Sequence, residues 1–462
     1  IYGARGANGV VIITTKKGKA GDVKISYTLS SSMTTVPRDR LPKMLNTSEF
    51  FDYEVGKAYY DPSNRTRVGD TEEWEYVNND ISSYNLRDPY YSGDDEEGGY
   101  LNRDEWNAQM PDTDWLGAVM KSGLVTNHLL NLSGGTEKNT YNYSLSYLDN
   151  EGIVIGSGYD RIILNINLKN KFTEKLNLNT SISPTYSKSY GTGGGGSSTR
   201  NSWGFFSRAM NTPSYIRLAD LSAGNDDLDD DSLDSFYRNP VYQATNEINN
   251  RTKYGIRFIS KATYDIFKGL RASVDFGMKF DRQEQRLFNP PTFGLGGRPA
   301  IGGRATRNDR TQFSYTNSNV LNYATVVGKH KINATLGVTQ QSRTTNNFMQ
   351  RANSFDIAEE DGSVNFDKAL SYDVPRVRNE EINQLGFLSR LNYVFNKRYS
   401  FTATMRRDGD SRFNKKNRFR NFPSMAFAWT VTKEPFMENV TFMDNWKIRL
   451  SAGKAGNSGV RP

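Results

Sequence analysis

Residues with the chemistry of a catalytic or metal site are few in this chain of 462 residues. It contains no cysteine and two histidines, His128 and His330. Disulfides, thiolate metal sites and cysteine nucleophiles are therefore excluded. No nucleophile lies beside a base in a recognisable motif. We predict that the protein is not an enzyme, has no catalytic residue and carries no cofactor.

Two runs of carboxylates are compatible with a structural calcium ion, because Ca²⁺ prefers oxygen ligands. They are Asp94, Asp95, Glu96 and Glu97, and Asp226, Asp227, Asp229, Asp230 and Asp231. Neither run has the EF-hand spacing with its terminal glutamate. Solvated surface loops are the expected setting, with a calcium site that orders a loop as the alternative. No other metal site is predicted.

Tryptophans in the long polar segments can stack on sugar rings, since one face of a sugar ring is apolar. The candidates for substrate contact are Trp74, Trp106, Trp115 and Trp203. The same side chains could instead pack the loops against one another or against a partner protein, and the sequence leaves both readings open.

The first residues, "IYGARGANGVVIITTKKGK", place glycines three residues apart, at Gly3, Gly6 and Gly9. Glycine permits positive φ and close approach of the backbone. The apolar run 10–13 that follows suits a strand buried on both faces. Phosphate binding is not expected, because no helix follows to offer its N-terminus.

The elements that position these residues are predicted to be long strands. From about residue 125 onward, apolar and polar residues alternate, as in "YNYSLSYLD", where Tyr141, Tyr143 and Leu145 lie opposite Asn142 and Ser144. Most such runs reach the ~9–11 residues of a membrane strand rather than the ~5–6 of a globular one. Mean hydropathy is −0.69, and no apolar run approaches the ~18 residues of a membrane helix. This excludes a helical membrane protein but not a membrane β-barrel.

The connections between the predicted strands alternate between short and long. Tight turns are expected at 134–139, 172–175, 267–269, 327–330 and 395–398, and long loops at 36–124, 189–252, 284–308 and 350–382. Short turns at one end and long loops at the other are typical of an outer-membrane barrel. We predict about thirteen strands, the first at about 22–35. In the first insert we expect a short helix, capped by Thr47 or Ser48, with Phe50, Phe51 and Val55 on its apolar side.

The net charge of +8 does not predict a nucleic-acid partner. The 59 basic residues are scattered among 51 acidic ones and form no single stripe. Solvated loops and a polar barrel interior explain them.

Several stretches resemble the SusC-like (SusC/RagA) subfamily of TonB-dependent outer-membrane transporters. The opening motif resembles the end of that family's plug domain, through Tyr2, Gly3, Arg5, Gly6, Asn8 and Gly9. Further matches follow in the family's order at 113–161, 390–429 and 446–459. The resemblance implies that residues 1–21 end a plug domain and its linker, with the opening motif acting as a gate element and hinge. Residues 22–462 would form the first part of a transmembrane antiparallel β-barrel, which has 22 strands in that family.

The resemblance also implies a function. The protein would be an active importer of oligosaccharides or peptides in the outer membrane. It would be energised by TonB through a segment that precedes residue 1 in the family, and would work with a SusD-like lipoprotein. The chain is expected to be a truncated piece that neither transports nor inserts stably alone, because the free edges of a half-barrel would expose unpaired backbone groups to lipid. The alternatives are a secreted soluble glycan-binding β-protein and a passive outer-membrane porin.

Overall fold

The computed structural model describes residues 18–59, 65–67, 74–76, 86–87, 100–191, 205–216, 240–289, 303–354, 366–438, 440 and 442–456. The opening glycine motif, both acidic runs and Trp203 lie outside the described residues, as does the side chain of Trp74. None of the helices in the described part of the chain has the length and hydropathy of a transmembrane helix.

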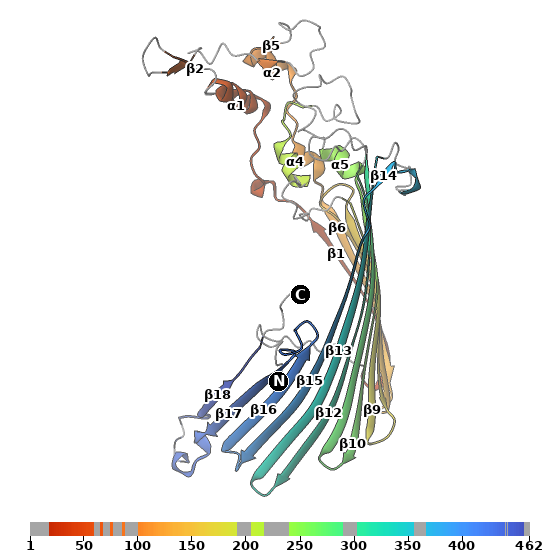
Figure 1. The fold of residues 1–462 in the computed structure, drawn as a ribbon, viewed down its shortest axis with the longest axis vertical. Coiled ribbons are helices and arrows are strands. Elements are labelled where there is room, and N and C mark those ends of the chain that lie inside the picture. Colours follow the sequence, from red (N-terminus) through yellow and green to blue (C-terminus); the bar gives the residue numbers. More distant parts are fainter. Residues whose placement is uncertain are drawn as a thin grey trace.

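One antiparallel sheet dominates the molecule, and its strands follow one another in chain order (Figure 1). The thirteen strands along it are β1 (Gly21–Thr34), β6 (Gly123–Gly135), β7 (Asn139–Glu151), β8 (Gly158–Lys171), β9 (Leu176–Tyr190), β10 (Ile248–Phe267), β11 (Leu270–Asn289), β12 (Arg304–Val327), β13 (His330–Asn353), β15 (Arg376–Phe395), β16 (Tyr399–Asp410), β17 (Phe419–Thr430) and β18 (Lys447–Gly453). A two-residue strand, β14 (Ser371–Tyr372), pairs with β13. The sheet curls into an open wall, the partial barrel that the alternation predicted.

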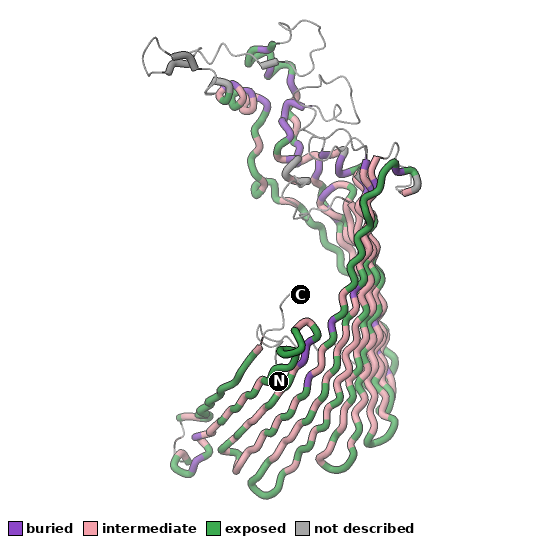
Figure 2. The backbone as a smooth tube through the Cα atoms, in the orientation of Figure 1, coloured by how far each residue is buried: buried purple, intermediate pink, exposed green. Residues whose placement is uncertain are grey.

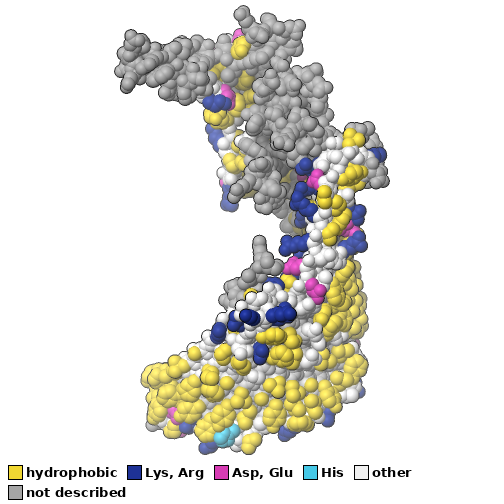
Figure 3. Space-filling model, viewed as in Figure 1, with side chains coloured by type: hydrophobic (Ala, Val, Ile, Leu, Met, Phe, Trp, Pro, Cys, Tyr) yellow, Lys and Arg dark blue, Asp and Glu magenta, His cyan; other side chains and the backbone are white. Residues whose placement is uncertain are grey.

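The period of two sorts the side chains of each strand onto two faces of this wall. On β11 the apolar residues Ala272, Val274, Phe276, Met278 and Phe280 share one face. Cross-strand register aligns Ala272, Met278 and Phe280 with apolar or aromatic residues of both β10 and β12. We call this convex side the outer face and the opposite, concave side the inner face. Figure 3 shows hydrophobic side chains covering the visible lower outer face, with charged side chains above them.

Aromatic rings border this apolar belt. At its upper border the rings of Tyr186 and Tyr254 lie 5.4 Å apart, and at its lower border Phe267 and Tyr323 lie 6.5 Å apart. Such paired girdles are found at the two interfaces of membrane barrels, because Tyr and Phe combine an apolar ring with tolerance of the headgroup region.

The strands extend beyond the belt, and the predicted loop boundaries were wrong in this respect. Strands β11, β12, β13 and β15 include 284–289, 304–308, 350–353 and 376–382, which the alternation placed in loops. Directly above the belt both faces are largely polar, and the outer face of β11 there carries Arg282, Glu284 and Arg286 before it reaches the buried Phe288. A strand segment that is exposed to water on both faces has no alternation of apolar and polar residues. The sequence pattern therefore stops at a lower position than the strand itself.

Tight turns join the lower ends of the strands from β6 to β16, whereas a longer segment connects β17 to β18. In the turns after β10 and β12, Gly269 and Gly328 have φ of 94° and 58°, which glycine adopts without steric cost. The turn after β15 instead places Asn396 and Lys397 at φ of 51° and 56°. The short turns of the sequence prediction therefore lie at one end of the wall, as Figure 1 shows.

The long segments at the upper end contain the helices. These are α1 (Thr47–Tyr59), α2 (Arg103–Gln109), α3 (Trp115–Val119), α4 (Phe205–Asn211) and α5 (Pro240–Asn246), together with the short strands β2 (Arg65–Arg67), β3 (Trp74–Tyr76), β4 (Leu86–Arg87) and β5 (Tyr100–Leu101). Figure 2 shows buried residues gathered in this helical part, whereas the sheet alternates between half-buried and exposed. Two of the buried clusters of the described residues lie in these upper segments, and a third, around Phe288, Ala305 and Ala352, lies at the upper ends of β11, β12 and β13.

The helix expected near residue 47 is present, but its predicted cap was wrong. Asn46 accepts a hydrogen bond from the Glu49 amide at 2.8 Å, and the Glu49 carboxylate accepts one from the Asn46 amide at 3.1 Å. This reciprocal pair is a capping box, placed one residue before Thr47. Phe51 and Val55 are buried in a cluster that also holds Trp106 and Trp115.

Candidate functional site

The inner face of the wall is the candidate site, since it forms the surface of any passage through a closed barrel. On strands β6 to β9 it is built largely from uncharged polar side chains that bond to one another. Asn142 donates to Asn131 at 2.8 Å. Asn165 donates to Ser144 at 3.3 Å and accepts from Ser183 at 2.9 Å. These ladders pair the amide and hydroxyl groups with one another and leave a hydrophilic surface.

On β10 and β11 the inner face is charged, and at belt level its charges are paired. Lys261 lies 3.0 Å from Asp275, and Arg271 lies 2.6 Å from Asp265. Both pairs are partly exposed, so each contributes little to stability. They do neutralise the charge of this part of the wall.

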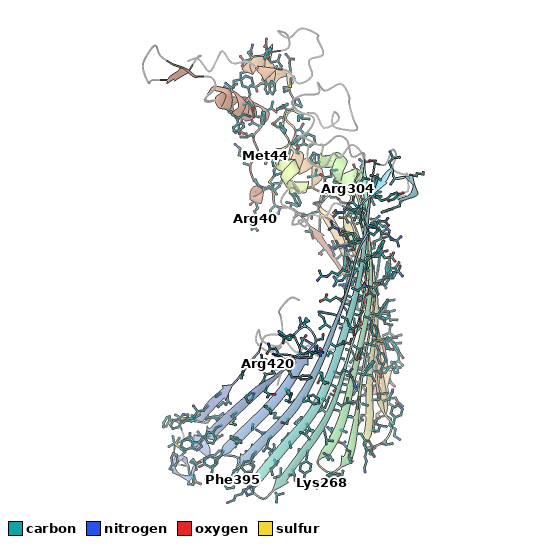
Figure 4. The ribbon with its side chains drawn as sticks, in the orientation of Figure 1. Arg40, Met44, Lys268, Arg304, Phe395 and Arg420 are labelled. Atoms are coloured by element: carbon teal, nitrogen blue, oxygen red, sulfur yellow. The ribbon has the colours of Figure 1, made fainter. Side chains whose placement is uncertain are left out.

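A cavity of about 340 Å³ opens on the inner side at the middle of β15, beside the upper ends of β16 and β17. Its lining includes Arg406, Asp408, Asp410, Arg420 and Lys454. Figure 4 labels Arg420 at this upper end of β17. The mixture of charges and hydroxyl or amide groups suits a hydrophilic ligand or a polar protein segment.

A bidentate ion pair fixes the loop beside this cavity. The Arg412 guanidinium donates to both carboxylate oxygens of Asp410, at 2.6 and 3.0 Å, and the Arg412 amide donates to the same carboxylate at 3.0 Å. Asp410 lies beyond the apolar belt, because the outer face of β16 already carries the charged Arg407 three residues earlier. Burial alone would raise the pKa of Asp410, but the hydrogen bonds from Arg412 and Gln384 outweigh it and lower this pKa to about 2.

Two of the four candidate tryptophans are buried inside the helical insert. Trp106 and Trp115 are 2% and 3% exposed. The Trp115 indole N–H donates to the Pro213 carbonyl at 2.9 Å, and the Trp106 ring packs edge-on against Tyr215, with 5.0 Å between ring centroids. In this structure both rings pack the loops against one another, and neither face is open for stacking on a sugar. Substrate contact by Trp74 and Trp203 stays a prediction.

Both histidines lie on the outer face, away from the inner wall. The Nδ1 atom of His128 is 2.7 Å from the Tyr27 hydroxyl, and that of His330 is 2.7 Å from the Tyr393 hydroxyl. Each imidazole thus satisfies a tyrosine hydroxyl on the surface of the belt. Within the described residues, no cluster of three or more potential metal ligands is formed.

Sequence reasoning singled out aromatic and acidic residues in the loops and missed the inner wall. The wall residues were visible as the polar half of each alternating run, such as Asn165 and Ser183. Their types carry no motif, and only the register shows which of them meet. The signal that could have found them is therefore cross-strand alignment, which needs the structure.

No family model matches the chain. Among curated proteins, the TonB-dependent receptor P3 of Formosa agariphila is 27% identical over 477 residues, covering all of this chain and 41% of the relative. The TonB-dependent receptor SusC of Bacteroides thetaiotaomicron is also 27% identical, over 479 residues that cover all of this chain and 42% of SusC. The chain thus spans about two-fifths of the length of these relatives.

Solved structures share the fold. The RagAB peptide transporter matches with a TM-score of 0.72 and 22% identity, over 100% of this chain and 50% of that chain. The "open-open" state of the RagAB peptide importer matches with a TM-score of 0.74 and 23% identity, over the same shares. By sequence over its whole length and by its partial barrel fold, the chain is a homologue of the SusC-like TonB-dependent receptors, which are β-barrel proteins of the outer membrane.

Proposed function

We propose that this chain forms part of the wall of an active importer in the outer membrane, which takes up oligosaccharides or peptides. The observation that carries the proposal is the division of one sheet into an apolar outer belt and a hydrophilic inner face. A soluble sandwich buries its apolar face against a second sheet. Here large apolar side chains such as Leu336, which is 58% exposed, stay uncovered, as lipid-facing residues do.

Energy from TonB and a SusD-like lipoprotein partner belong to the same proposal. The support is the likeness to receptors named as TonB-dependent and to the RagAB complex. The opening motif, whose plug resemblance supports coupling to TonB, lies outside the described residues. The helices form a surface at the upper end of the wall, and a partner would approach from that side (Figure 1).

The test is uptake by cells that express the gene in its full natural reading frame. A panel of labelled neutral oligosaccharides, acidic oligosaccharides and peptides is supplied, with and without a protonophore and in a TonB deletion strain. We expect accumulation of at least one class, abolished by both treatments. Uptake that persists without TonB would identify a porin instead.

A secreted binding protein is the alternative from another class. It predicts that the protein leaves the membrane fraction without detergent. Recovery in the outer membrane, released by detergent alone, is the result that we expect.

A further inference from the structure

Six arginines gather on the upper inner face between β10 and β15. Register places them on one face of the wall: Arg257 lies opposite Lys279, which aligns through Ser314 with Arg343. Two inner-face rows higher, Arg310 aligns through Asn347 with Arg378. Neighbouring strands are ~4.8 Å apart, so Arg310 and Arg378 stand roughly 10 Å from each other. The six residues, all exposed, are Arg251, Arg257, Arg310, Arg343, Arg376 and Arg378, and we call them the arginine patch.

The arginines of the patch lack the carboxylate partners that neutralise the cations lower on β10 and β11. At belt level Lys261 and Arg271 each have a carboxylate partner. Within the described part of the chain, no ion pair is formed by any of the six arginines. Asp281, an acid on the same upper face, is already shared by Lys279 and Lys253.

Unpaired cations on a concave wall produce a positive potential, because the low-dielectric protein behind them focuses the field. The potential attracts anions and raises their rate of entry. Arginine adds geometry, since its planar guanidinium forms two parallel hydrogen bonds with a carboxylate or sulfate group. The patch is thus suited to a ligand that presents several such groups in series.

The residues between the arginines favour a hydroxyl-rich ligand over a peptide. They are mostly amides and hydroxyls, and the patch rows include Gln283, Gln285, Asn308, Ser314 and Asn347.

We propose that the arginine patch selects an acidic oligosaccharide, bearing carboxylate or sulfate groups, as the imported substrate. The inference rests on the proposed import function and narrows its substrate class. The patch begins at the upper part of the apolar belt, where Arg257 lies just below Tyr254, and extends above the belt toward the upper strand ends that Arg304 marks in Figure 4. An entering substrate would therefore meet it before reaching the paired charges of the belt-level wall.

The experiment uses the receptor purified from outer membranes after expression in its natural reading frame. Binding of three probes of equal length is measured by calorimetry: a hexauronate, a neutral hexasaccharide and hexaglutamate. A sulfated hexasaccharide distinguishes sulfate from carboxylate as the recognised group. The test variant is Arg310→Gln with Arg378→Gln. The matched control is Arg282→Gln, which removes a cation at a similar height on the outer face.

The proposal expects an acidic hexasaccharide to bind at least tenfold more tightly than the neutral one. The double variant should weaken this binding by about tenfold or more, and added salt should weaken it further. Arg282→Gln should bind like the unmodified receptor. Tighter binding of hexaglutamate, equal binding of the neutral sugar or an unaffected double variant would each overturn the proposal.

The acidic-substrate proposal and the proposed import function can fail independently, and different results identify each failure. A receptor that imports neutral sugars or peptides with TonB dependence retains its function and refutes only the acidic substrate. Loss of TonB dependence refutes the import mechanism whatever the probe.

Discussion

Leu336 tests whether the outer face of the wall meets lipid. It lies on β13 near the middle of the apolar belt, opposite Leu321 of β12, and is 58% exposed. The perturbation is Leu336→Arg. Its matched control is Thr335→Arg, one residue earlier on the same strand and therefore on the inner face.

The expected penalties differ because the two side chains enter different media. An arginine that faces lipid near the bilayer centre costs about 2–4 kcal/mol, or about 30-fold in the folding equilibrium at the lower end. Thr335→Arg loses the hydrogen bond that Asn322 donates to Thr335 at 2.9 Å, a cost of about 1 kcal/mol. The new guanidinium on the inner face stays in water, and its repulsion from Arg390, directly opposite on β15, adds less than about 1 kcal/mol.

The assay is the guanidinium midpoint of the receptor expressed in its natural reading frame and inserted in lipid vesicles. Outer-membrane yield and heat-modifiable migration on gels serve as a second readout. We expect Leu336→Arg to lower all three markedly and Thr335→Arg to change them little. Equal effects, or a larger effect at Thr335, would refute the assignment of the two faces.

The remaining predictions concern the upper end of the molecule. Trp115→Phe should lower the local free energy of unfolding by about 1 kcal/mol more than Trp106→Phe does. The reason is that Trp115 loses its hydrogen bond to Pro213, whereas the buried Trp106 N–H has no partner among the described residues. Local hydrogen exchange measures both costs, and equal costs would contradict this account. Asp410→Asn should destabilise the loop by about 1.5–3 kcal/mol, since the variant loses the ion pair with Arg412. The expected measurement is faster proteolytic cleavage of that loop in the variant. The pKa of Asp410 is lowered to about 2. The stability that Asp410 contributes to the loop should therefore be complete above about pH 4 and lost as the pH falls toward 2. If the stability of the loop in the unmodified protein does not change between these pH values, this prediction is wrong.

Much of the fold could be predicted because the alternation of side chains is a local property of the strand. Runs such as 141–147 and 162–168 predicted long strands with one apolar face, and the structure confirms the antiparallel partial barrel. The helix at Thr47–Tyr59 was also predictable, from its apolar spacing. Its cap was placed one residue late, since Asn46, Thr47 and Ser48 are all competent caps and only the Glu49 contact distinguishes them.

The candidate site was much less predictable than the fold. The tryptophans were chosen for their chemistry, yet Trp106 and Trp115 are buried in the core of the insert. Burial depends on what packs above a residue from distant parts of the chain; Pro213, for example, is about a hundred residues from Trp115. No local pattern carries that information.

By itself, the sequence determined the strands, their two-faced character and the parity of short and long connections, because each depends on residues within about ten positions of one another. The tertiary structure alone decided which inner residues meet. Arg310 and Arg378 are 68 positions apart in the chain, and register through Asn347 sets them two strands apart on one face. The physical reason is that a shift of one residue in pairing would move every side chain of a strand to the opposite face, so the inner face exists only once the whole sheet is aligned.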